Sequence, residues 1–135
     1  MEKEIREDSL SSLALAYLGD AVLEIHIRDY VIRTGKAKLH DLHRASVRYV
    51  CANAQSRVYD RIQPYLDEEE LDVLKKGRNT KKKIPKNVLM KDYRKSTGLE
   101  ALLGHLYLNK REGRIIEVVD LIIGIVEGRI SHEVD

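Results

Sequence analysis

LAYLGDAVL, residues 15–23, is apolar except for one aspartate, Asp20. Apolar residues follow helical spacing from Leu10 to about Arg33, which predicts one long helix with Ser9 as its N-cap. Because apolar side chains occupy nearly every face of this helix, we expect it at the centre of a bundle, with Asp20 buried. Burying a carboxylate costs several kcal/mol unless a cation, hydrogen-bond donors or a proton compensates its charge. Asp20 is therefore the first candidate for a functional residue.

The length and composition predict one globular domain, residues 1–135, with its core at about 9–128. The chain has 135 residues, 43% of them hydrophobic, which is enough for one core. Its apolar runs fall far short of the roughly 20 residues that a bilayer span needs, and its charged N-terminus is unlike a signal sequence. The single cysteine, Cys51, excludes an internal disulfide and a cysteine-cluster zinc site. We therefore expect a soluble, cytoplasmic protein.

Further helices are predicted along the rest of the chain, and no useful stretch alternates as a strand would. Asp67 with Glu70 three residues later is typical of a capping box, and Gly77 suits the position after the last turn of that helix. Pro64 marks the end of the preceding helix. The predicted helical ranges are 39–63, 67–77, a piece from 88, 96–108 and 115–128. The predicted fold class is all-α, a single-domain helical bundle.

A second apolar helix carries a second isolated acid. The segment STGLEALLGHLYL, residues 96–108, has Glu100 as its only formal charge. Packing of this helix beside the first would bring Asp20 and Glu100 together, and Gly19, Gly98 and Gly104 would permit a close approach of backbones or of a ligand. Mg²⁺ is commonly bound by one or two carboxylates, with phosphate oxygens and water completing its octahedron. The pair therefore indicates a magnesium site for phosphoryl transfer.

A structural role for the two acids is the alternative. A single buried carboxylate is more often paired with an arginine or capped by backbone donors than bound to a metal. Glu24, one turn after Asp20, would be joined to it through Arg28 in such an arrangement. Periodicity alone leaves this alternative open.

Several motifs together resemble the ribonuclease III family. LAYLGDAVLE at 15–24 is similar to the signature helix of its catalytic domains, whose core is LGDAVL, and STGLEALLGHLYL resembles the family's second acidic helix. KGRNTK at 76–81, PKN at 85–87 and YRKSTGLEALLGHLYL at 93–108 resemble the compact Mini-III ribonucleases. The resemblance covers residues 11–124, and the two acidic motifs appear in the family's order within a helical domain.

The resemblance implies a reaction, a metal and an oligomeric state. Ribonuclease III enzymes cut both strands of double-stranded RNA as homodimers, using carboxylate-held Mg²⁺, for which Mn²⁺ substitutes, and leave 5′-phosphate and 3′-hydroxyl ends. Asp20 and Glu100 match the metal-binding, catalytic acids of the family. Leu13 and Thr97 stand where larger relatives carry two further acids, which implies fewer protein ligands here. The compact branch is associated with maturation of large-subunit ribosomal RNA precursors in bacteria.

Positive charge is concentrated in one segment, although the net charge is only +2. The stretch from Lys75 to Lys86 carries seven cations with no acid until Asp92, and from Gly77 onward it is predicted to be a basic loop. We expect no separate double-stranded-RNA-binding domain after Gly128, so this loop is the natural contact for the phosphates of A-form RNA. The predicted RNA-binding residues are Lys76, Arg78, Asn79, Lys81, Lys82, Lys83 and Lys86. The alternative is a solvated loop without a ligand.

Two other functions stay open on the sequence. One is a non-catalytic RNA-binding helical module in which the two acids make only structural contacts. The other is a His-Asp metal-dependent phosphohydrolase, with His40, Asp41 and His43 as candidate ligands, although the further spaced ligands it needs are not evident. The leading hypothesis is a Mg²⁺-dependent endoribonuclease that acts on duplex RNA.

Overall fold

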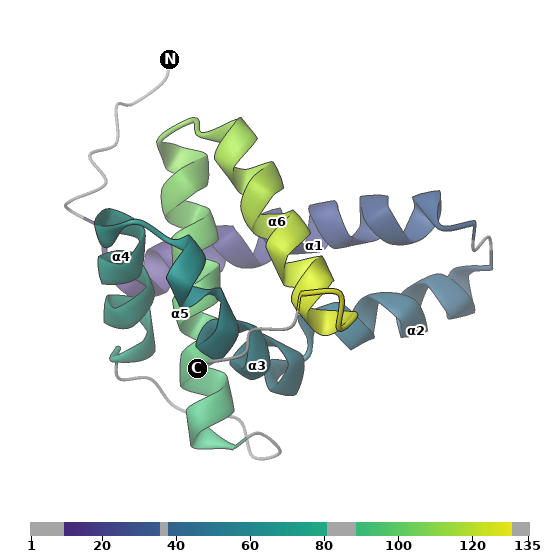
Figure 1. Cartoon of the computed structure of the whole chain (residues 1–135), viewed down its shortest axis with the longest axis horizontal. Helices are drawn as coiled ribbons and strands as arrows, with labels where there is room; N and C mark the ends of the chain where they lie inside the picture. Colours follow the sequence, from purple (N-terminus) through teal and green to yellow (C-terminus); the bar gives the residue numbers. More distant parts are fainter. Residues whose placement is uncertain (1–9, 36–37, 81–88, 131–135) are drawn as a thin grey trace.

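The structure is a computed structural model that describes residues 10–35, 38–80 and 89–130. Within these ranges all regular structure is helical, which confirms the all-α class. The elements are α1 (Ser12–Arg33), α2 (Leu39–Val50), α3 (Ala52–Ile62), the 3-10 helix η2 (Gln63–Tyr65), α4 (Glu68–Arg78), α5 (Met90–Leu108) and α6 (Glu112–Val126). In Figure 1, α5 crosses the first half of α1, and α2 returns beside its second half. None of the helices in the described ranges is long and apolar enough to cross a membrane.

The first helix starts slightly later than predicted. Its N-cap is Ser11, whose hydroxyl accepts a hydrogen bond from the Ala14 N–H at 3.1 Å, whereas Ser9 lies outside the described residues. This bond satisfies one of the N–H groups that the first helical turn leaves without a partner. The helix ends at Arg33, as predicted.

The helix predicted over 39–63 is wrong as a single element. α2 and α3 are separated at Cys51, whose backbone is extended with φ −67° and ψ 154°. No proline causes this break; the corner instead lets Tyr49 on one side and Ala54 on the other both enter the core. The Gln55 side-chain amide supports the corner by donating to the Tyr49 carbonyl at 2.7 Å.

The capping box predicted at the start of α4 is present. The Asp67 carboxylate accepts from the Glu70 N–H at 2.8 Å, and the Glu70 carboxylate accepts from the Asp67 N–H at 2.9 Å. The predicted end at Gly77 is wrong, because α4 continues to Arg78. A Cβ on Gly77 would lie 2.8 Å from the Gly98 Cα of α5, so this glycine permits close packing of two helices instead of forming a turn.

The central helix is α5, not the α1 helix that the sequence favoured for that place. The piece predicted from 88 and the helix predicted at 96–108 belong to one element, although Val88 itself lies outside the described residues. Every residue from Ser96 to Leu106 except Glu100 is buried, because α5 is packed against α1, α3, α4 and α6. The fully buried apolar residues come from all the long helices except α2: Ile27, Ala54, Val58, Ile62, Leu74, Leu99, Ala101, Leu102, Leu103, Val118 and Ile122.

One carboxylate ties the end of α6 to α1 and α2. The Tyr30 and Tyr49 hydroxyls both donate to Glu127 Oε2, at 2.5 and 2.6 Å, and Arg129 donates to Oε1 at 2.8 Å. Burial acts to raise the pKa of Glu127, but these hydrogen bonds outweigh it and lower the pKa. Burial and the bond to Glu127 raise the pKa of Tyr49 to about 12. The contact fixes the angle between α6 and the α1–α2 pair.

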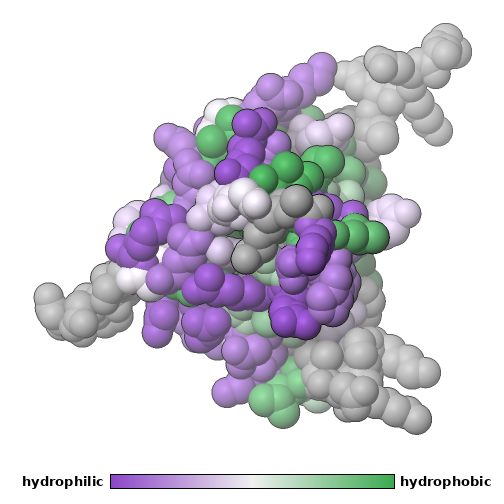
Figure 2. All heavy atoms as spheres, turned by 90° about the vertical axis from the view of Figure 1, so that its right-hand side faces the viewer, coloured by the Kyte–Doolittle hydropathy of each residue, from purple (hydrophilic) through white to green (hydrophobic). Residues whose placement is uncertain are grey.

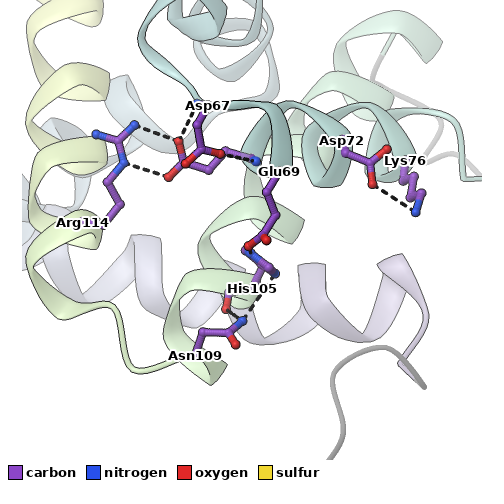
Figure 3. Close-up of polar contacts among 8 residues, drawn as sticks. Asp67, Glu69, Asp72, Lys76, His105, Asn109 and Arg114 are labelled. Atoms are coloured by element: carbon purple, nitrogen blue, oxygen red, sulfur yellow. Dashed lines mark hydrogen bonds and ion pairs between the residues drawn. The ribbon is translucent and has the colours of Figure 1, made fainter.

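A buried ion pair joins α4 to α6, as Figure 3 shows. Glu70 is only 2% exposed, and the Arg114 guanidinium donates to its two carboxylate oxygens, each at 2.8 Å. Arg114 also donates to the Tyr65 carbonyl at 2.8 Å. The hydrogen bonds from Arg114 hold the pKa of Glu70 below its usual value, although burial opposes them. Glu70 is therefore a structural carboxylate, because a cation balances its buried charge and hydrogen-bond donors reach both of its oxygens.

Candidate active site and RNA-binding surface

A close helix crossing lies between α1 and α5, where glycine replaces a larger side chain on both helices. A Cβ on Gly19 would overlap the carbonyl oxygen of Glu100, and a Cβ on Gly104 would overlap the carbonyl oxygen of Leu15. Backbone therefore contacts backbone at this point, as only glycine allows. Asp20 follows Gly19 directly, so the two acids predicted to act together, Asp20 and Glu100, lie beside one crossing.

The structure corrects the expectation that both acids are buried. Asp20 is exposed and Glu100 is half-buried. The reason is that α1 is apolar on nearly every face while the rest of the chain covers only part of it. Its uncovered stripe includes Tyr17, which is 87% exposed, and Ile25, which is 65% exposed. Asp20 lies in this stripe and can reach solvent, ions or a substrate.

The arginine alternative is not supported for Asp20. Arg28 pairs with Glu24 at 3.3 Å, one turn along α1. No ion pair or hydrogen bond of the Asp20 carboxylate is found within the described ranges, whereas Glu100 does interact with a neighbour. Asp20 is therefore available as a ligand.

The positions of the two missing family acids hold no carboxylate. Leu13 is half-buried on α1, and the buried Thr97 hydroxyl donates to the Tyr93 carbonyl at 3.0 Å. Across residues 10–35, 38–80 and 89–130, no three His, Cys, Asp or Glu side chains are grouped to hold a metal ion. A site made by Asp20 and Glu100 thus has at most two protein carboxylates from the described residues.

This donor set fits Mg²⁺. Mg²⁺ keeps several waters and is usually bound by one or two carboxylates together with substrate phosphates, in preference to a cage made by protein alone. An exposed Asp20 and a half-buried Glu100 leave one side open for those waters and for a phosphate. A structural zinc or calcium site would need more protein ligands than this crossing offers.

The predicted RNA-binding residues are only partly described. Lys81, Lys82, Lys83 and Lys86 lie outside the described residues. Lys76 was expected to have no counter-ion, but it pairs with Asp72 at 3.1 Å, one turn earlier in α4 (Figure 3). Both of these side chains are largely exposed, so the pair is weak. Arg78 and Asn79 lie at the exposed end of α4.

Three cations near this end were missing from the sequence prediction. Lys91, Arg94 and Lys95 lie in the first turns of α5 and line the same cleft as Arg78 and Asn79. Their spacing of three and four residues places them on one side of a helix. That spacing was visible in the segment KDYRK, within the helical piece predicted from 88, but the positive charge considered for RNA binding was that of the stretch from Lys75 to Lys86.

The histidines of the phosphohydrolase alternative do not form a metal site. His40 lies on α2, where Arg44 contacts its Nε2 at 2.7 Å. A guanidinium that donates to this nitrogen occupies the lone pair that a metal would need. Asp41 is half-buried and His43 is exposed on the same helix, and neither belongs to a cluster of candidate ligands in the described part of the chain.

Comparison with known proteins identifies a ribonuclease III domain in this chain. The family model for this domain matches residues 13–111, a range that contains both acids and the whole of the α1–α5 contact. A crystal structure of a protein from Fusobacterium nucleatum has a TM-score of 0.78 to this chain at 35% identity, covering 90% of this chain and 98% of that one.

Curated relatives give the narrower assignment. A Mini-ribonuclease 3 from Brevibacillus brevis is 46% identical over 132 residues, which cover 95% of this chain and 98% of that protein. A Mini-ribonuclease 3 from Clostridium tetani is 43% identical over 126 residues, which cover 92% and 83%. The chain belongs to the ribonuclease III family of endoribonucleases, in its Mini-ribonuclease 3 branch, which confirms the resemblance seen in the sequence.

Proposed function

We propose that this chain is a Mg²⁺-dependent endoribonuclease that cuts double-stranded RNA, with Asp20 and Glu100 as its catalytic and metal-binding acids. The observation that best supports this proposal is the contact between Gly19 and the Glu100 carbonyl, because it puts the two acids beside one helix crossing. Membership of the ribonuclease III family supports the reaction class. Mn²⁺ is expected to substitute for Mg²⁺.

The chain's own residues provide a rigid and open ligand pair. Asp20 and Glu100 come from two long helices in backbone contact, so their relative position does not depend on a loop. The bound ion supplies a Lewis acid that neutralises charge on the phosphate and lowers the pKa of water. Asp20 faces solvent and admits the RNA backbone, while the half-buried Glu100 holds its side of the site near the core.

Two substitutions test the assignment of the acids. Asp20→Asn and Glu100→Gln keep the side-chain size and remove one charge each, so each should lower cleavage of duplex RNA by at least about 100-fold, as loss of a group that stabilises transition-state charge does. Cleavage by the unmodified chain should require Mg²⁺ and stop with a chelator. Glu24→Gln, on the same helix one turn away, is the control and should retain activity within about twofold. Cleavage at the unmodified rate by both acid variants would contradict the assignment.

Duplex recognition is proposed to come from the end of α4 and the segment that follows it. Lys76, Arg78 and Asn79 supply described side chains, and Lys81, Lys82, Lys83 and Lys86 are proposed to extend the surface. A-form RNA is recognised mainly through its phosphates and 2′-hydroxyls, which a row of cations and an amide suits. Single-stranded RNA of the same sequence should therefore compete poorly in a binding titration; equal competition would contradict duplex selectivity.

A homodimer is proposed because one site of this kind cuts one strand. The exposed stripe of α1 supports it, since Tyr17 and Ile25 leave a large apolar surface uncovered on the helix that carries Asp20. Ile25→Asp should shift the chain to a monomer in sedimentation equilibrium. Leu39→Asp, at an apolar residue of α2 that is 81% exposed, is the control and should stay dimeric. Monomeric unmodified protein would contradict the proposal.

The biological substrate is proposed to be a large-subunit ribosomal RNA precursor, which would place the enzyme in the cytoplasm. The basis is the resemblance to the compact branch, which implies this substrate, and the relatives named Mini-ribonuclease 3 support membership of that branch. Incubation of the purified chain with such a precursor should give defined products with 5′-phosphate ends. Random fragments or no product would contradict this substrate. Activity on duplex RNA in general is tested separately, by the cleavage assay with the Asp20 and Glu100 variants.

A further inference from the structure

A basic cleft lies between the end of α4 and the start of α5, two turns before Glu100. It has a volume of about 290 Å³ and is lined by Arg78, Asn79, Met90, Lys91, Arg94 and Lys95. Four of these six residues are cations, and no acid of the described ranges lines the cleft. Asp92 lies between two of the cations in sequence, but it is buried and does not line the cleft.

Two of the four cations are held in place by α3. Lys95 is 20% exposed, pairs with Asp60 at 2.8 Å and has its Nζ 5.9 Å from the centre of the Tyr59 ring. Arg78 lies beside the same tyrosine: burial raises the pKa of Tyr59, and the nearby guanidinium acts in the opposite direction. One side of the cleft is therefore arranged before any ligand arrives, which lowers the entropic cost of binding.

The other two cations have no acid to neutralise them. Lys91 and Arg94 make no ion pair with any residue of the described part of the chain. They are three residues apart on α5 and face the same cleft. Arg94 is half-buried, and a partly desolvated guanidinium without a counter-ion favours an anion, above all a phosphate that matches its fork of donors.

We infer that this basic cleft holds a backbone phosphate of the RNA duplex and positions the strand relative to Glu100. Arg94 and Glu100 are six residues apart on one uninterrupted helix, a rise of about 9 Å along the axis. A phosphate held by Lys91 and Arg94 is thereby kept at a constant distance from the candidate metal site. The inference rests on the proposed function, and it makes Lys91 and Arg94 positioning residues, not catalytic ones.

Binding of a 5′-hydroxyl RNA duplex, measured in chelator at several salt concentrations, tests the inference. Lys91→Gln with Arg94→Gln should weaken binding by about tenfold or more and reduce the slope of log affinity against log salt by about one to two, since each phosphate contact contributes about 0.9. Arg44→Gln with Arg48→Gln, on the α2 helix that Figure 1 shows far from α4, should leave the slope unchanged. Lys91→Arg with Arg94→Lys should restore the slope because it restores the charge.

Kinetics and a second substrate complete the test. In Mg²⁺ the Gln pair should raise KM by about tenfold and keep kcat within about twofold, because the contact holds substrate and transition state alike. With a duplex that has 5′-phosphate ends, the Gln pair should lose the same affinity. A loss of affinity seen only with that duplex would assign the cleft to terminal phosphates and overturn the inference. If the Gln pair does not fold, the exposed single variant Lys91→Gln should still reduce the slope by about one.

The outcomes separate this inference from the function on which it rests. An unchanged slope in the Gln pair, with normal duplex binding and cleavage by the unmodified chain, overturns the cleft and leaves the proposed function intact. Failure of the unmodified chain to bind duplex RNA overturns both.

Discussion

Glu70 and Asp20 are two acids of one helical chain in opposite environments. Glu70 is 2% exposed and accepts two hydrogen bonds from Arg114, in addition to its role in the capping box of α4. Asp20 is exposed beside the α1–α5 crossing and has no ion pair within the described residues. A structural carboxylate in this protein is thus buried and fully paired, whereas the candidate functional one is open on a rigid support. The absence of a built-in partner is what leaves Asp20 available for a metal.

The surface shows the same contrast on a larger scale. On the face drawn in Figure 2, hydrophilic side chains predominate and hydrophobic ones emerge between them. The α1 stripe around Asp20 instead presents Tyr17 and Ile25 with little cover. Apolar neighbours in the sequence therefore did not place Asp20 in the core. They determine which residues a helix presents on its surface, but not which parts of that surface another helix covers.

The support beneath Asp20 gives the largest expected effect. Gly19→Ala would place a Cβ on the carbonyl oxygen of Glu100 and force α1 from α5, at a cost of at least about 3 kcal/mol in the free energy of unfolding. This cost must exceed the roughly 1 kcal/mol that alanine gains over glycine in a helix. Gly113→Ala on α6, where a Cβ meets nothing within 4 Å, is the matched control and should be neutral or slightly stabilising. Urea unfolding measures both.

If Gly19→Ala unfolds at the same urea concentration as the unmodified chain, the close crossing does not exist in solution. The comparison would then lose its rigid support, and the relative position of Asp20 and Glu100 would have to come from another part of the chain.

The next effect concerns the paired acid. Arg114→Met leaves Glu70 buried without its cation and should lower the free energy of unfolding by about 3 kcal/mol at neutral pH. The pKa of Glu70 lies below its usual value of 4.5 in the folded chain, so the pair is fully effective above that pH and weakens as pH falls through the folded-state pKa. The difference between Arg114→Met and the unmodified chain should therefore shrink in acid, as urea titrations at a series of pH values would show. A difference that does not change with pH would contradict this account.

The smallest effect comes from one chemical change made at both acids. Glu70→Gln should cost about 1–3 kcal/mol, because it weakens the bonds to Arg114 inside the protein. Asp20→Asn should change stability by no more than about 0.5 kcal/mol, because it is exposed and unpaired. Melting curves of the two variants, measured under the same conditions, compare the two losses of stability. A similar loss in both variants would show that Asp20 has a structural partner after all.

Much of the fold could be predicted because the signals were local. The end of α1 at Arg33 and the capping box of Asp67 and Glu70 depend on residues a few positions apart. The corner at Cys51 and the role of Gly77 could not be predicted in this way, because the corner depends on which side chains enter the core and Gly77 depends on its contact with Gly98 of α5. Gly77 carries the composition of a turn but serves a helix contact with Gly98.

The candidate site was predictable in part. The two isolated acids and the glycine beside Asp20 were evident from the sequence, but the exposure of Asp20 was not. The cations Lys91 and Arg94 were overlooked because they share a surface with Arg78 only when the start of α5 packs beside the end of α4.

The sequence by itself determined the helical class, the ribonuclease III resemblance and the identity of two acids on separate apolar helices, because periodicity and motif order are properties of neighbouring residues. Only the tertiary structure decided that α5 occupies the centre, that the stripe carrying Asp20 stays uncovered and that two glycines bring the helix backbones into contact. The physical reason is that burial and close approach depend on which helix covers which face, and that is settled when distant segments pack together.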